Sequence, residues 1–190
     1  MSAVTVAQRM TAEEFVEAPV PDRGRPWNLV DGEVVMTQPT VLHARAQSNV
    51  LFALEVWTRA QPGRGMVIVP IDVRLDDRNV FAPDALWYSA EHLFDETDPP
   101  PYPMPDLAVE IRSPSTWRYD IGAKKAGYER HGLRELWLVD TAADEVLVFR
   151  RSKTDAPAFD IALELDCEQQ LTSPLLPGFA LPLAQLFPQR

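Results

Sequence analysis

Cysteine, histidine and lysine are all scarce in this sequence. Its 190 residues include one cysteine, Cys167, three histidines and three lysines. A single cysteine excludes an internal disulfide and a zinc site built from several cysteines. Long apolar runs are absent too, so a transmembrane helix is not expected. The first residues lack the basic region and apolar core of a signal peptide, and we therefore expect a cytoplasmic protein with no membrane partner.

Positive charge is also in short supply. The chain has 18 lysine and arginine residues against 28 aspartate and glutamate residues, which gives a net charge of −10. Proteins that hold nucleic acid by neutralising phosphates usually have a basic face, so strong DNA binding by the whole surface is not expected. A local basic patch or a partner subunit would have to attract the DNA. Part of the acidity lies in the proline-rich segment 89–106, which we interpret as an exposed loop or, alternatively, as a flap over a cleft.

The pattern of apolar residues predicts one α/β (α+β) domain over residues 1–190, with a mixed central sheet flanked by helices. Thr11 and Glu14 form a capping box, and Asp31-Gly32 indicates an N-terminal β-hairpin. Helices are expected at 11–18, 40–61 and 119–130, with a short one near the C-terminus. Strands are expected at 27–38 (the hairpin), 65–75, 79–89, 107–111, 134–140, 145–151 and 159–166. The core positions expected on the second helix are Val41, Leu42, Ala46, Val50, Leu54 and Trp57.

A glutamate lies within the apolar strand expected at 107–111. Alternate residues of a strand face the same side, so Glu110 shares a polar face with Asp106 and Arg112. A buried carboxylate is costly unless its charge is compensated. Asp106 lies about 13 Å from Glu110 along the strand, which is too far to chelate the same ion. Asp84, in the stretch FAPDALWY, is the best candidate for a second carboxylate, and two carboxylates on adjacent strands can hold magnesium.

The helix expected at 119–130 has a lysine on the face that also carries Asp120 and Tyr128, because Asp120, Lys124 and Tyr128 are spaced by four residues. Most of the basic residues are arginines, so a lysine here is informative. A compact ammonium can orient a water or stabilise a phosphorane, and its pKa can be shifted, whereas arginine stays protonated. The alternative is a surface lysine paired with Asp120. Tyr128 is expected to pack with its hydroxyl at the surface or, alternatively, to act in the chemistry.

The stretch VEIRSPSTWRYDIGAKKAGYERHGLRELWLVD resembles the signature of the Uma-two family of restriction endonucleases, in the PD-(D/E)XK nuclease superfamily. The segments NLVDGEVV, QPTVLHARAQSNVLFAL, APDALWY and LLPGFALPLAQLF follow the usual order of that family, so the resemblance covers nearly the whole chain. It implies a restriction-endonuclease-like fold and a phosphodiesterase site that uses Mg²⁺ or Mn²⁺. By position, Asp84 and Glu110 would be the metal ligands and Lys124 the helix-borne lysine.

Arg112 departs from the family pattern, which usually has an aliphatic residue two positions after the glutamate. In the wider superfamily this position holds the catalytic lysine, so Arg112 could restore a cation there or neutralise Glu110. A guanidinium can bind phosphate but cannot act as a general base. Arg112 and Lys124 therefore both stand as candidate catalytic cations.

Four other polar residues are candidates for structural or functional roles, and three of them have more than one interpretation. Glu33 follows the hairpin turn and is expected to be exposed, although it could complete the metal shell. His43 is expected to be a satisfied structural histidine on the second helix, or alternatively a contact of the site. Gln47, four residues on, shares its face. Asp140 is expected to cap a turn.

The sequence thus predicts a metal-dependent endonuclease in which water attacks a DNA phosphodiester in line. Nucleases of this size often cut duplexes as symmetric pairs, so a homodimer is expected from the class alone. One alternative is a non-catalytic binding or regulatory protein with the same fold, which the acidic surface and Arg112 favour. Another is a metal-dependent hydrolase of small phosphodiesters, which a net charge of −10 would tolerate better than long DNA.

Overall fold

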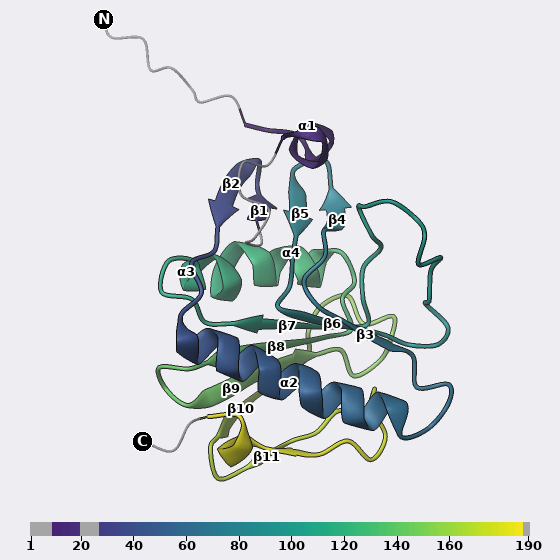
Figure 1. Cartoon of the computed structure of the whole chain (residues 1–190), viewed down its shortest axis with the longest axis vertical. Coiled ribbons are helices and arrows are strands. Elements are labelled where there is room, and N and C mark those ends of the chain that lie inside the picture. The colour runs from purple at the N-terminus through teal and green to yellow at the C-terminus, as the bar shows by residue number, and fades with distance from the viewer. Residues whose placement is uncertain (1–8, 20–26, 188–190) are drawn as a thin grey trace, which may run out of the picture.

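Two sheets and an intervening helix organise the computed structural model, which describes residues 9–19 and 27–187 (Figure 1). The smaller sheet has the strand order β2 (Glu33–Met36), β1 (Trp27–Val30), β5 (Asn79–Phe81), β4 (Val73–Asp76). The larger has the order β10 (Ile161–Asp166), β9 (Glu145–Arg150), β8 (Glu135–Asp140), β7 (Leu107–Ile111), β6 (Ala85–Tyr88), β3 (Met66–Ile68). A short ribbon pairs β11 (Gln170–Leu171) with β12 (Leu181–Pro182). The predicted mixed α+β architecture is confirmed.

The helices pack on both faces of the six-stranded sheet, apart from the first, which packs on the smaller sheet. They are α1 (Ala12–Glu17), α2 (Val41–Arg59), α3 (Trp117–Tyr119), the π-helical turn η1 (Asp120–Lys124), α4 (Lys125–Arg130) and the 3₁₀ turn η2 (Leu183–Gln185). Helix α2 crosses one face, while α3, η1 and α4 run continuously between the two sheets (Figure 1). That run connects β7 to β8, which are parallel, whereas the other strand pairs of the sheet are antiparallel. No helix of the described chain is long and apolar enough to cross a membrane.

The start of the chain folds as its local signals predict. Thr11 and Glu14 form the capping box at the start of α1. Asp31 and Gly32 both have positive φ, 50° and 80°, which is the backbone of a tight turn between β1 and β2. The hairpin and its turn are therefore confirmed.

Two stretches predicted as single strands are each divided between the sheets, which corrects that prediction. Segment 65–75 splits into β3 and β4, and segment 79–89 splits into β5 and β6. Pro70 and Pro83 lie at the breaks, where a proline cannot donate to a strand ladder. The second break matters for function, because it leaves Asp84 immediately before β6.

Helix α2 packs a narrower stripe than predicted. Its buried residues are His43, Ala46, Val50, Leu54 and Trp57. Val41 and Leu42 were expected in the core and are instead exposed, at 77% and 41%. The helix begins at Val41, with Thr40 as its N-cap, and the sheet-facing stripe starts two residues later, at His43.

The helix expected from 119 begins earlier, at Trp117, and includes the π turn η1. Its apolar side chains join those of both sheets in one core cluster: Val30, Val35, Phe81, Ala108, Tyr128, Leu133, Leu136 and Leu138. The helix is therefore buried on two sides, which places Asp120, Lys124 and Tyr128 inside the protein.

Candidate active site

Asp84 is held at the end of β7 by contacts from two elements, β7 and α2. Its Oδ2 accepts a hydrogen bond of 2.6 Å from the backbone N–H of Ile111, and its Oδ1 lies 3.1 Å from Nε2 of His43. Gln47, one turn along α2, donates to the backbone carbonyl of Asp84 at 2.8 Å. His43 thus contacts the site, as its alternative interpretation had it, and Gln47 shares that role.

Burial is the largest single influence on the pKa of His43 and disfavours its charge, whereas the Asp84 carboxylate favours it. Backbone carbonyls of Ile111 and Arg112 act in the same direction, so the pKa of His43 is raised above its ordinary 6.5. The imidazole and the carboxylate are both almost completely buried. The pair therefore fixes the orientation of Asp84 whether the histidine is neutral or charged.

Glu110 makes buried contacts with the helical run from α3 to α4. Its Oε1 accepts a hydrogen bond from the Tyr128 hydroxyl at 2.5 Å and lies 2.6 Å from Nζ of Lys124. Tyr128 is fully buried, so the prediction of a surface hydroxyl is wrong. The reason is the packing of α4 between two sheets, which leaves this face of the helix no access to water.

Lys124 is shared between two carboxylates. Besides Glu110, its Nζ lies 3.2 Å from Oδ1 of Asp120, and both side chains are buried. The predicted pairing with Asp120 is therefore present, but inside the protein and not at its surface. The π turn from Asp120 to Lys124 widens the helix where this lysine faces Glu110, and such turns often occur at functional sites.

The cluster has more negatively charged groups than positively charged ones. Burial raises the pKa of Glu110, and Asp120 and Asp84 raise it further, while Lys124 opposes the shift. Burial raises the pKa of Asp120 as well. Burial alone would lower the pKa of Lys124, but the surrounding carboxylates outweigh it and raise that pKa, so the lysine stays protonated. Three carboxylates thus share one ammonium and one imidazole.

The donor set of Asp84 and Glu110 fits a divalent metal ion. The described residues contain no group of three or more histidines, cysteines or carboxylates arranged as ligands. Magnesium, however, is ordinarily held by only one or two carboxylates, with waters and substrate phosphates completing its shell. The contacts of Tyr128 and Lys124 both fall on Oε1 of Glu110, and a dication beside this carboxylate would offset the excess of negative charge.

Arg112 is not the cation on Glu110. Its Nη1 binds both carboxylate oxygens of Asp140, at 2.9 and 2.8 Å, and its guanidinium lies 5.6 Å from the Trp117 ring. The suggestion that Arg112 neutralises Glu110 is therefore wrong, because Lys124 occupies that place. Asp140 also accepts from two backbone N–H groups of the following turn, so its capping role is confirmed.

Glu33 lies outside the carboxylate cluster. It is exposed on β2, as expected, and accepts a hydrogen bond from the Tyr119 hydroxyl at 3.2 Å. Nothing in this contact brings it to Asp84 or Glu110. A place for Glu33 in the metal shell finds no support in the described geometry.

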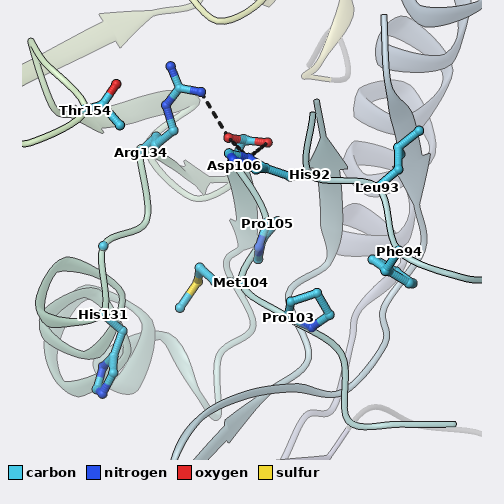
Figure 2. A pocket seen from close by; sticks show the side chains of 11 residues that line it. His92, Leu93, Phe94, Pro103, Met104, Pro105, Asp106, His131, Arg134 and Thr154 are labelled. Carbon is cyan, nitrogen blue, oxygen red and sulfur yellow. Dashed lines mark hydrogen bonds and ion pairs between the residues drawn. The ribbon is translucent and has the colours of Figure 1, made fainter. Parts of the chain in front are cut away.

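A pocket of about 380 Å³ lies at the opposite end of β7 (Figure 2). Asp106 lies in its wall, where Nδ1 of His92 and Nη1 of Arg134 bind it at 2.8 and 3.0 Å. Asp106 is therefore compensated locally, just before β7 begins, while Glu110 lies near the end of that strand. The acidic loop 89–106 supplies several of the residues that line this pocket, at the end of β7 away from the Glu110 cluster.

The fold is that of a nuclease-like protein, as comparison with a solved structure shows. A similar solved structure is that of a "putative nuclease belonging to DUF820" from Anabaena variabilis ATCC 29413. The TM-score is 0.77 at 18% identity, and the match covers 94% of this chain and 97% of that one. A sequence model of the Uma2 family, described as "Putative restriction endonuclease", matches residues 12–184, so the chain belongs to this family and the resemblance is confirmed. No curated protein matches the chain.

Sequence reasoning identified three residues of the cluster as candidate site residues and gave two others a structural role as the first interpretation. Asp84, Glu110 and Lys124 are brought together by β6, β7 and η1. His43 and Tyr128 were each assigned a structural role first. Residue spacing was the one sequence feature that could have indicated their place in the site. His43 lies four residues before Gln47, and Tyr128 lies four residues after Lys124.

Proposed function

We propose that this protein is a divalent-metal-dependent endonuclease that hydrolyses DNA phosphodiester bonds, with Mg²⁺ or Mn²⁺ held by Asp84 and Glu110. The observation that carries the proposal is the buried contact of Lys124 with Glu110, in the electrostatic field of Asp84. Burying an ammonium costs free energy because the charge loses its hydration, and a lysine with only a structural role does not need to be buried in this way. The family description and the nuclease fold support the same function.

Each residue of the cluster has a distinct task in this proposal. A bound divalent metal supplies a Lewis acid and lowers the pKa of a water molecule. Asp84 and Glu110 provide carboxylate oxygens, and His43 keeps Asp84 in its orientation. Lys124 orients the attacking water and stabilises the negative charge that develops on the phosphate. Asp120 holds the ammonium in place from the other side.

Arg112 has a peripheral task in the same proposal. Its guanidinium is about one-third exposed, and its Nη1 is engaged with Asp140. Its remaining N–H groups can bind a phosphate next to the reacting one. The attraction for DNA is expected to be local, because the net charge of −10 opposes binding by the surface as a whole. A homodimer with one site per strand stays a proposal from the class of enzyme.

The decisive experiment is calorimetric titration with Mn²⁺ and Mg²⁺, followed by cleavage of supercoiled plasmid. The variants are Asp84→Asn and Glu110→Gln, which we expect to lose metal binding and cleavage together. Asp106→Asn is the matched control, because it alters a buried carboxylate at the other end of β7 and should bind metal like the wild type. Circular dichroism establishes that each variant is folded.

Two results would redirect the proposal. A folded wild type that binds neither ion would contradict a catalytic role and favour a binding or regulatory protein. Metal binding with hydrolysis of a small aryl phosphodiester, but none of DNA, would indicate a hydrolase of small phosphodiesters.

A further inference from the structure

The Tyr128 hydroxyl is directed at the carboxylate on which the proposed reaction depends. It donates to Oε1 of Glu110 at 2.5 Å, at the short end of the range for a hydroxyl bound to a charged acceptor. Lys124 contacts the same oxygen at 2.6 Å. With both donors on Oε1, the carboxylate cannot rotate freely, and Oε2 is kept in one direction.

A second buried tyrosine shows what a purely structural hydroxyl does in this protein. Tyr88 is also fully buried, and its hydroxyl donates to the backbone carbonyl of Pro103 at 2.8 Å. A buried hydroxyl needs one partner, and a carbonyl meets that need without involving a charged group. Tyr128 instead uses the side chain of Glu110, which is inside the carboxylate cluster.

The position of the Tyr128 ring is fixed by the smaller sheet. Phe81 of β5 packs edge-on against it, with ring centroids 5.1 Å apart and planes at 77°. The helix can come this close because Gly127 has no side chain: a Cβ there would lie 3.0 Å from the Phe81 ring. Packing against strand β5 thus holds α4 and Tyr128 next to β7 (Figure 1).

We propose that Tyr128 is a positioning residue, which fixes Oε1 of Glu110 and thereby presents Oε2 to the metal. This inference rests on the proposed function, since it concerns the same site. It predicts that loss of the hydroxyl weakens metal binding while the ring keeps the packing of the core. Outer partners of metal ligands commonly contribute about 10- to 100-fold to affinity.

The test is Tyr128→Phe, studied by calorimetric titration with Mn²⁺ in the absence of DNA. We expect a Kd raised about 10-fold or more, with unchanged stoichiometry. Tyr119→Phe is the matched control, because its hydroxyl also donates to a glutamate, but to the exposed Glu33. That variant should bind Mn²⁺ like the wild type.

A second measurement separates positioning from a general loss of structure. Plasmid cleavage by Tyr128→Phe should be slow at low Mn²⁺ and recover as the Mn²⁺ concentration is raised, which a misfolded variant could not do. Wild-type affinity in the folded Tyr128→Phe variant would overturn the positioning role and leave the proposed function standing. Absence of Mn²⁺ binding in the wild type itself would overturn the proposed function, and the role of Tyr128 with it.

Discussion

The ammonium of Lys124 compensates two carboxylates that are almost completely buried. Glu110 and Asp120 both have raised pKa values, chiefly through burial, and both depend on this one cation. Breaking a buried ion pair by removing one partner usually costs more than the pair contributes, because the other charge is left uncompensated. The lysine is therefore expected to matter for folding as well as for chemistry.

Substitution of Lys124 by methionine should destabilise the protein by about 3–5 kcal/mol at alkaline pH. The sign of the pH effect follows from Glu110, whose folded-state pKa is raised above 4.5. Its contribution to stability is fully present below 4.5 and is lost as the pH rises through the raised value. Removal of Lys124 raises that pKa further, so the penalty should be larger at about pH 9 than at about pH 5.

Urea denaturation at the two pH values measures the effect. The control is Lys125→Met, which removes the neighbouring lysine, whose Nζ lies 4.4 Å from the Phe149 ring centroid. Its cost should be below about 1 kcal/mol and nearly independent of pH. Equal losses in the two variants would contradict a special role for Lys124.

The run from α3 through η1 to α4 places Asp120, Lys124 and Tyr128 on the side that faces β7. The sequence predicted this helix and the common face of the three residues, because both follow from spacing. It did not predict the π turn or the burial, since those depend on the smaller sheet that closes over the helix. Periodicity describes one helix at a time and carries no information about what packs on its second side.

Two glycines of this run offer a matched pair of substitutions. An added Cβ at Gly127 would meet the Phe81 ring at 3.0 Å, whereas at Gly122 nothing lies within 4 Å. We expect Gly127→Ala to destabilise by about 1–3 kcal/mol through overpacking. Gly122→Ala should be neutral or stabilise by up to about 1 kcal/mol, because alanine favours helix. Unfolding in urea gives both values, and a reversed order would refute the close approach of α4 to β5.

Strand β7 separates two polar regions that belong to opposite ends of the larger sheet. The Glu110 cluster lies toward its carboxyl end, and the pocket with Asp106 lies where it begins. The order of elements and the candidate residues were predictable from the chain, because hairpin, capping and periodic signals are local. The assignment of strands to two sheets was not predictable from the chain. Pro70 and Pro83 each divide a run in which the segments before and after the proline have similar apolar patterns.

Neutralising the acidic loop tests this separation. The double substitution Glu96→Gln and Asp98→Asn changes two exposed side chains of the acidic loop, which lines the pocket at the opposite end of β7 from the Glu110 cluster. We expect metal affinity to stay within about twofold of the wild type, because screening in water weakens distant surface charges. Calorimetry measures it, with Asp84→Asn as the variant that should fail. A large change in affinity would indicate that the loop reaches the cluster after all.

The hydrogen bond from the Ile111 amide to Oδ2 of Asp84 has one more consequence. At 2.6 Å, the resonance frequency of this proton in an NMR spectrum must respond to the electron density on that carboxylate. Protonation of Asp84, or a cation drawn to it, lowers that density and moves the signal. The backbone next to Glu110 thus contains a natural spectroscopic probe, which can follow occupancy of the site in solution without a substrate or a label.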